Sequence, residues 1–118
     1  MKNAEILEGN KLIAKFMGLR EIGFGENRHF IDAGNRIIAM YYNLKYHTSW
    51  DWLMPVVEKI ENDDLYRVII FRGSCDIELI ESNSVDSNFE TIEKSGMNKN
   101  ISTWLAVLEF IKWYNENK

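Results

Sequence analysis

The fold is decided by the stretch Ser102-Thr-Trp-Leu-Ala-Val-Leu-Glu-Phe-Ile-Lys-Trp-Tyr114, near the end of the 118-residue chain. The serine that opens it is a residue type that often caps a helix, because its hydroxyl accepts a free backbone N–H. Nearly every later position is apolar, and only a narrow polar stripe remains at Glu109, Lys112 and Glu116. A helix that is hydrophobic almost all round is buried. The stretch therefore predicts a deeply embedded helix with Trp104 in the core.

Two further helices are predicted upstream, of which the first lies near the start of the chain. Asn3–Met17 places apolar residues near one helical face, and Gly18 follows where a C-terminal cap would lie. Gly9 and Asn10 fall inside this pattern. Because glycine costs about 1 kcal/mol inside a helix, the regular part of this helix is expected to begin only at Asn10.

The second helix is expected to start after Thr48 or Ser49, since either hydroxyl can accept a first-turn N–H. Its apolar residues keep helical spacing as far as Ile60. Pro55 lies inside this pattern and has no N–H to donate, so we expect it to bend the helix.

Two apolar runs predict strands that are covered on both faces. Arg36–Asn43 contains six consecutive apolar or aromatic residues, and Arg67–Arg72 contains four. Unbroken runs of this length are typical of strands buried on both sides. After a turn at Gly73, the alternation from Cys75 to Leu79 predicts a second strand with one solvent face. We expect the first strand of this hairpin to be interior and the second to lie nearer a sheet edge.

Two segments predict loops. Gly23-Phe-Gly-Glu-Asn-Arg28 spaces two glycines as a phosphate-binding turn does, but it lacks the third glycine and the Gly-Lys-Ser/Thr ending, which favours a β-turn. The segment 82–100 is rich in Ser, Asn, Asp and Glu, which predicts a long, mobile loop with a short strand around Phe89–Ile92.

Together these elements favour an α+β fold of one domain, residues 1–118. Two strands apolar on both faces need cover on both sides, and three apolar-faced helices are available to supply it. We therefore expect a three-layer α/β/α sandwich with a mostly antiparallel sheet and three helices.

Composition and charge narrow the class of protein. The chain is 46% hydrophobic and 27% charged, a balance of globular domains rather than of disordered tails. One cysteine, Cys75, allows no intramolecular disulfide and no cysteine-based zinc cluster. The start of the chain has no apolar run of signal-peptide length, and no segment reaches the about 20 apolar residues of a membrane span, so a cytoplasmic location is expected. A net charge of −4 with scattered basic residues argues against a large nucleic-acid footprint.

Three stretches carry a resemblance to a known family: Asn10-Lys-Leu-Ile-Ala-Lys-Phe-Met-Gly18, Leu44-Lys-Tyr-His-Thr-Ser-Trp-Asp-Trp-Leu-Met-Pro-Val-Val-Glu-Lys-Ile60 and Thr103-Trp-Leu-Ala-Val-Leu-Glu-Phe-Ile-Lys-Trp-Tyr-Asn115. They resemble the phage α/β/α sandwich domains, small uncharacterised proteins of Bacteroidetes genomes and their phages. The resemblance covers the three helices, somewhat under half of the chain, and the second stretch is its most specific part. It implies a three-layer fold and a phage or prophage setting, and it transfers no catalytic residue.

The densest group of reactive side chains is Tyr46-His-Thr-Ser-Trp-Asp51. His47 as a base for Ser49, oriented by Asp51, is one interpretation. Neighbouring residues at a helix start point in different directions, however, and no Gly-x-Ser-x-Gly elbow is present, so a structural role is favoured.

A metal site would need His29, Asp32, His47 and Asp51 to meet, and no His-x-x-x-His or His-Glu-x-x-His spacing enforces that. Cys75 alternates inward with apolar neighbours and is interpreted as a buried, unreactive thiol. We expect no catalytic residue, no metal and no cofactor.

Four tryptophans and five tyrosines are many for a core of this size, so some are expected at an interface. The leading hypothesis is a small protein-interaction module without catalytic activity, which self-associates or binds a phage or host protein. Its expected surface is Tyr46, His47, Trp50 and Trp113. One alternative is a small metal-dependent hydrolase-like enzyme around His47 and Asp51. Another is a nucleic-acid accessory protein, whose basic stripe would combine the distant residues Arg28, Arg36, Arg67 and Arg72.

Overall fold

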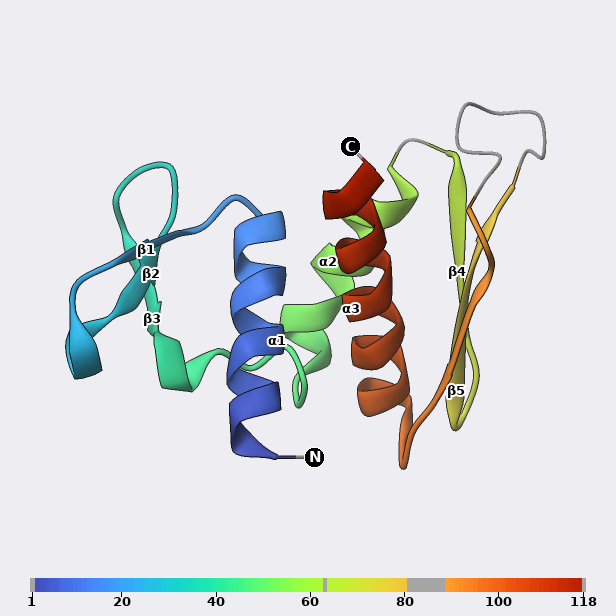
Figure 1. Cartoon of the computed structure of the whole chain (residues 1–118), viewed down its shortest axis with the longest axis horizontal. Helices are drawn as coiled ribbons and strands as arrows, with labels where there is room; N and C mark the ends of the chain where they lie inside the picture. The colour runs from blue at the N-terminus through green and yellow to red at the C-terminus, as the bar shows by residue number, and fades with distance from the viewer. Residues whose placement is uncertain (1, 63, 81–88, 118) are drawn as a thin grey trace.

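The structure is a computed structural model that describes residues 2–62, 64–80 and 89–117. In this part of the chain, three helices lie between two small antiparallel sheets (Figure 1). The helices are α1 (Asn3–Phe16), α2 (Trp50–Glu61) and α3 (Lys99–Asn117). None of these helices is long and apolar enough to cross a membrane.

Each sheet has three described strands that follow chain order. The first sheet is β1-β2-β3 and the second is β4-β5-β6, and every pairing is antiparallel. Two short 3-10 turns, η1 (Gly25–Asn27) and η2 (Tyr41–Asn43), flank strands of the first sheet. The strands are β1 (Arg20–Ile22), β2 (His29–Ile31), β3 (Ile37–Met40), β4 (Tyr66–Ile70), β5 (Ser74–Leu79) and β6 (Ile92–Ser95).

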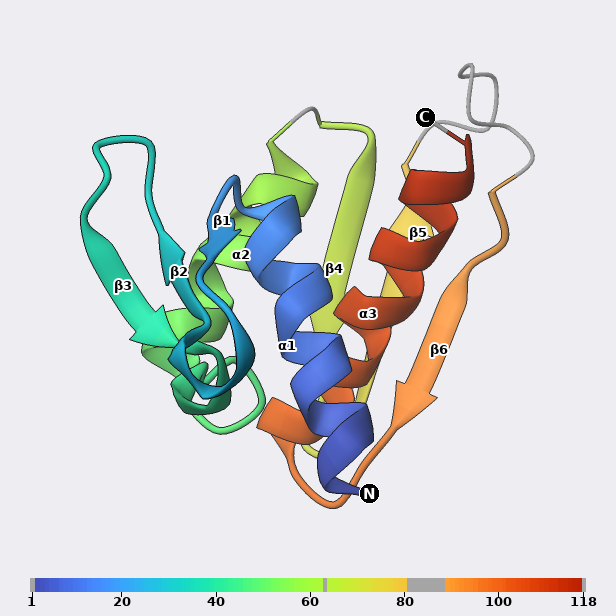
Figure 2. The same cartoon turned by 60° about the vertical axis from the view of Figure 1, so that its left-hand side comes forward.

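The predicted α+β class, the antiparallel pairing and the three helices are confirmed. The predicted three-layer sandwich around one sheet is not confirmed, because the described strands form two separate sheets. α3 packs on β5 and β6, α2 packs on β4, and α1 packs on α3. Figure 2 shows α3 lying across the second sheet, with α1 in front of it and β6 at the edge of the sheet.

The burial predicted for two strands is wrong. β3 was expected to be covered on both faces, yet Ile37 is 69% exposed and Ile38 is 40% exposed. The first sheet lies beside the helices rather than between two helical layers, so a face of β3 is left open (Figure 1). β4 was expected to be interior, but it is an edge strand, and β5 occupies the centre of its sheet. The alternation of β5 is confirmed, since Cys75 and Ile77 are fully buried.

The predicted first helix is found and begins at Asn3, so its regular part starts earlier than the expected Asn10. Gly9 lies inside it because α3 crosses α1 at this point. A Cβ atom placed on Gly9 would lie 2.6 Å from Cζ2 of Trp104 and 2.8 Å from Cδ1 of Leu108. The glycine therefore permits a close helix crossing whose packing offsets its poor helix propensity.

The predicted helix caps differ from the observed ones. Ser49 occupies the N-cap position of α2, but its side chain makes no capping hydrogen bond. α3 begins at Lys99, and Asn98 caps it, because its Oδ1 accepts the N–H of Ile101 at 2.9 Å. Ser102 was predicted as this cap but lies within the helix, fully buried, and its hydroxyl donates to the Lys99 carbonyl at 3.1 Å.

Two predictions about irregular segments have different outcomes. The glycine-rich segment 23–28 is a turn, as predicted, and Gly23 and Gly25 adopt positive φ angles of 98° and 56°. The predicted strand around Phe89–Ile92 is found slightly later, as β6. Residues 82–88 of the predicted loop lie outside the described residues. Pro55 lies inside α2, as its place in the pattern indicated.

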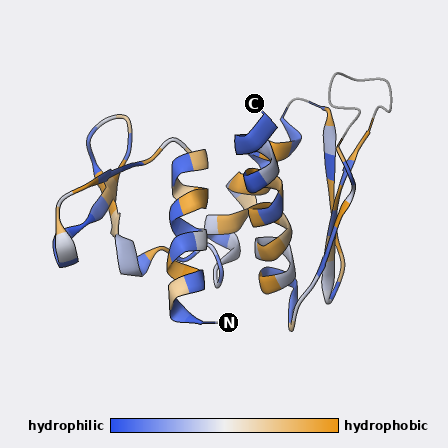
Figure 3. Cartoon of the chain, in the orientation of Figure 1, coloured by the Kyte–Doolittle hydropathy of each residue, from blue (hydrophilic) through white to orange (hydrophobic). Residues whose placement is uncertain are grey.

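The core is centred on α3, as the opening stretch predicted. Trp104 is 1% exposed, and five other apolar residues of α3 are also buried. Figure 3 shows hydrophobic residues concentrated where α2 and α3 lie together, while the C-terminal turn of α3 is hydrophilic. The five are Ala106, Val107, Leu108, Phe110 and Ile111, and Trp113 beyond them is half-buried.

Candidate interaction surfaces

A buried polar network joins α1, α3 and the segment before α2. Asn10, which is 1% exposed, donates from Nδ2 to the Leu44 carbonyl at 3.0 Å and to Nδ1 of His47 at 3.0 Å. Its Oδ1 accepts the indole N–H of Trp104 at 2.8 Å. Asn10 thereby satisfies the only polar group of the buried indole and one carbonyl of the 44–49 segment.

His47 has a structural role in this network. The amide nitrogen of Asn10 can only donate, so Nδ1 of His47 accepts and the ring is neutral. Burial lowers the pKa of His47, which favours the same neutral form. Asn10, rather than Ser49 or Asp51, is its hydrogen-bond partner, so the predicted hydrolase-like group does not form a catalytic pair here.

The predicted interaction surface is wrong at Tyr46, which is 4% exposed. Its ring meets Trp52 edge-on at 5.2 Å, and burial raises the pKa of Tyr46 to about 12. The amide of Asn100 donates to the Tyr46 carbonyl at 3.3 Å, which fixes the backbone as well. His47 and Trp50 are half-buried neighbours of this packed segment.

Trp113, the fourth predicted surface residue, belongs to a different part of the molecule. It is half-buried near the end of α3, where its ring lies 4.7 Å from Phe89 and 6.1 Å from Tyr66. Phe110 completes this aromatic cluster, at 6.0 Å from Trp113. The predicted surface is therefore divided between the α2 start and the junction of α3 with the second sheet.

The residues considered for a metal site are engaged locally. Asp32 accepts the backbone N–H groups of Gly34 and Arg36 and pairs with the Arg36 guanidinium, contacts that lower the pKa of its carboxyl. Nδ1 of His29 donates to the Asn27 carbonyl at 2.8 Å. Within the described residues, no group of three or more His, Cys, Asp or Glu side chains is placed to hold a metal ion.

Cys75 lies near the start of β5, the central strand of its sheet, and is fully buried. Burial raises the pKa of its thiol to about 11, with only partial compensation from the Thr103 side chain. The thiolate is the reactive form of cysteine, so this position is chemically quiet in the folded protein.

An exposed apolar set lies on the first sheet and its flanking turns, and three of its members fall in the segment Arg36–Asn43, which was predicted to be covered on both faces. It comprises Ile22, Phe24, Ile37, Ile38 and Tyr42, with exposures of 41%, 91%, 69%, 40% and 55%. Ile37 and Ile38 are neighbours on one strand, so their side chains point to opposite faces of the sheet and both faces expose apolar surface near β3. Large exposed apolar side chains gathered on one small sheet favour an interaction site. The sequence signal was present in the apolar run of β3, but periodicity cannot tell a covered strand from one awaiting a partner.

The charges around this set are balanced. Residues 20–43 contain three arginines and three acidic residues, so the net charge of −4 belongs to the rest of the chain. Arg36 pairs with Asp32, and the Arg28 guanidinium lies 4.3 Å above the Tyr41 ring. The basic stripe of the nucleic-acid alternative is not assembled, because Arg28 and Arg36 directly precede β2 and β3 of the first sheet, whereas Arg67, which pairs with Glu78, lies on β4 of the second (Figure 1).

Comparison with known protein families, with curated proteins and with solved structures gives no match to this chain.

Proposed function

We propose that this chain is a small protein-interaction module without catalytic activity that assembles with a second copy of itself through the first sheet. The single observation that carries the proposal is the exposed apolar set on that sheet, above all Ile37 and Ile38 on β3. β3 is also an edge strand of its sheet, paired within the described residues only with β2. An edge strand with exposed isoleucines can add a further strand and bury apolar surface at once.

A second copy is the favoured occupant because of charge. The first sheet is electrically neutral, whereas the rest of the chain carries −4. Two copies meeting through their first sheets therefore bring no net like charge together, whereas contact between two acidic faces would be repulsive. Two antiparallel β3 strands related by a twofold axis would form an isologous interface, the commonest kind in homo-oligomers.

The setting of this module is proposed to be a phage or prophage protein in the cytoplasm. Support comes from the resemblance of the three helical stretches to phage α/β/α sandwich domains. It does not come from the first sheet, which lies outside those stretches.

Sedimentation velocity tests the self-assembly. We expect wild type to sediment as a dimer at about 100 µM, in the concentration range where modest interfaces form. Ile37→Glu places a charge on each side of the interface, so it should sediment as a monomer with an unchanged circular dichroism spectrum. Met97→Glu is the matched control, because Met97 is 90% exposed but lies outside the first sheet, and this variant should remain dimeric.

Two results contradict the proposal. A wild type that is monomeric throughout the concentration range removes self-association and leaves a different protein as the occupant. A dimer that survives Ile37→Glu but is lost in Met97→Glu places the interface elsewhere on the molecule.

A further inference from the structure

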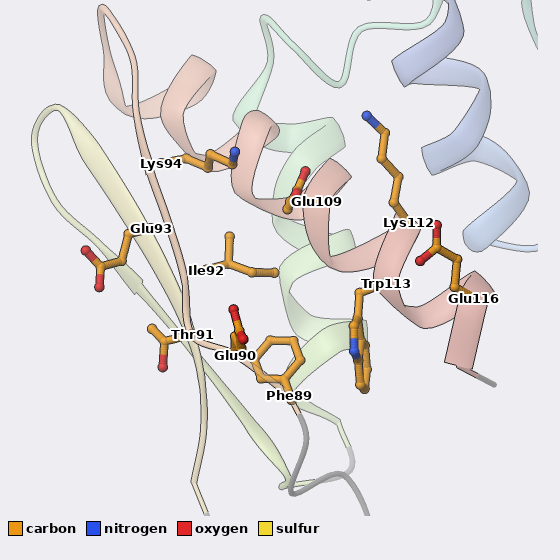
Figure 4. A pocket seen from close by; sticks show the side chains of 10 residues that line it. All are labelled: Phe89, Glu90, Thr91, Ile92, Glu93, Lys94, Glu109, Lys112, Trp113 and Glu116. Atoms are coloured by element: carbon orange, nitrogen blue, oxygen red, sulfur yellow. The ribbon is translucent and has the colours of Figure 1, made fainter.

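A groove of about 560 Å³ lies between β6 and the C-terminal half of α3. Figure 4 shows the strand side chains Glu90, Ile92 and Lys94 directed toward the helix, and Thr91 and Glu93 directed away from it. The helix side is lined by Glu109, Lys112, Trp113 and Glu116. The groove is thus bounded along its length by one extended segment and one helix.

The strand that bounds the groove has an open edge. Within the described residues, β6 pairs only with β5. The N–H of Gly96 donates to the Gly73 carbonyl at 3.1 Å, so these two residues form a hydrogen-bonded pair. Hydrogen-bonded and non-hydrogen-bonded pairs alternate in an antiparallel ladder. The backbone groups of Lys94 therefore face β5, and those of Glu93 and Ser95 face outward.

The groove is apolar at its base and acidic at its rim. Phe89 and Ile92 are each 8% exposed and form the base with the half-buried Trp113. Four glutamates and two lysines line the groove, so acids exceed bases by two. The exposed glutamates are Glu90, Glu93, Glu109 and Glu116.

We infer that this groove binds an extended, basic peptide segment of another protein, which adds to the second sheet as a strand beside β6. The outward backbone groups of Glu93 and Ser95 supply the pairing. Alternate side chains of such a strand point to opposite faces, so apolar residues can enter the groove over Ile92 and Trp113. The side chains between them point to the opposite face of the sheet, where Glu93 is directed, and its charge favours lysine or arginine there.

This site is separate from the exposed apolar set, since the two lie on different sheets on either side of the helices (Figure 1). The inference goes beyond the proposed self-assembly, and neither needs the other. Ile37→Glu, which tests the assembly, leaves every groove residue unchanged.

The probe is a displayed library of random 12-residue peptides, panned against the full chain. We expect enriched sequences in which lysine or arginine alternates with apolar residues, and saturable binding of their synthetic forms in fluorescence anisotropy. Affinity should fall as salt is raised, since exposed charges are screened.

The decisive variant is Glu93→Pro, which removes an outward N–H and spares the ladder with β5, as proline at strand edges does. It should weaken peptide binding by about tenfold or more relative to Glu93→Gln, the matched control that removes the charge but keeps the N–H. Should Glu93→Pro fail to fold, Glu109→Lys combined with Glu116→Lys tests the same groove from exposed helix positions. That double variant should also bind about tenfold more weakly, with a shallower salt dependence.

Three outcomes would overturn the inference. One is a panning experiment that enriches no sequence, and another is enrichment of acidic or purely apolar peptides. The third is equal binding to Glu93→Pro and Glu93→Gln when both fold.

Discussion

Removal of the Asn10 side chain tests the polar network at the centre of the molecule. In Asn10→Ala, the Trp104 N–H and the Leu44 carbonyl lose their partner, although these residues are 1% and 2% exposed. A buried polar group without a partner costs about 1–3 kcal/mol. Two such groups and the lost His47 contact predict a decrease of about 3–5 kcal/mol in the free energy of unfolding, out of the about 5–15 kcal/mol of a typical domain. At about 4 °C per kcal/mol, the melting temperature should fall by about 12–20 °C.

Urea and thermal unfolding, followed by circular dichroism, measure this decrease. Asn10→Asp is the informative companion, because it keeps an acceptor for Trp104 but faces the Leu44 carbonyl with a second oxygen. Protonation of that carboxyl would restore a donor, so Asn10→Asp should recover stability relative to wild type between pH 7 and pH 4, roughly the range in which a buried carboxyl titrates. A decrease below about 1 kcal/mol for Asn10→Ala would refute the reasoning, since it would mean that water replaces the amide.

Three further predictions concern single positions. Gly9→Ala should lower the free energy of unfolding by about 1–3 kcal/mol in urea titration, because its Cβ would overlap the packed rings of α3, whereas Gly34→Ala, in an open turn, should change it little. The lowered pKa of His47 means that the unfolded chain binds its proton first as the pH falls below 6.5, so stability should fall with pH there; His47→Gln should flatten this dependence and His29→Gln should not. Cys75 should resist alkylation at about pH 8 in the native state and react fully in denaturant, and rapid native modification would contradict its burial.

The three helices could be predicted from the sequence because each has enough apolar residues at helical spacing to show the periodicity of a helix. The residues that cap these helices could not be predicted in the same way. Ser102 has the chemistry of an N-cap, but a serine inside a buried helix can satisfy its hydroxyl on a carbonyl of the preceding turn, here that of Lys99. Asn98, four residues before the first buried residue of α3, caps the helix instead. Sequence offers both residues, and only the packing of α3 selects between them.

For the strands, the sequence predicts the elements but not how deeply they are buried. Ile37-Ile38 and Ile69-Ile70 look alike as sequence, but the first pair lies on a sheet that the helices leave open. The second pair is half-buried on a sheet that α2 and α3 cover. Burial of a short apolar run depends on which elements from other parts of the chain pack against it, and the local sequence pattern does not indicate this.

The contacts of the segment around Tyr46 and His47 could not be predicted from the sequence for the same reason. Tyr46 and His47 drew attention as reactive or aromatic side chains, yet Asn10 and Asn100, 36 residues before and 54 after Tyr46 in the numbering, hold that segment in place. The network uses a glycine and an asparagine that had been interpreted as a weak helix start. Gly9 leaves room for the Trp104 ring to pack against α1, and Asn10 accepts the hydrogen bond of the Trp104 indole N–H.

The two proposed surfaces are related by their places in the fold. The helices and the Asn10 network account for many of the buried polar and aromatic groups. Among the described strands, β3 and β6 are edge strands of different sheets, on opposite sides of the helices (Figure 1). A dimer joined through β3 would present two acidic grooves in a fixed geometry. A partner with two basic segments would then bind the second groove intramolecularly, so its avidity could exceed single-groove affinity by about 10²–10⁴ when the spacing matches. Ile37→Glu should remove that gain and leave the affinity for a single peptide unchanged.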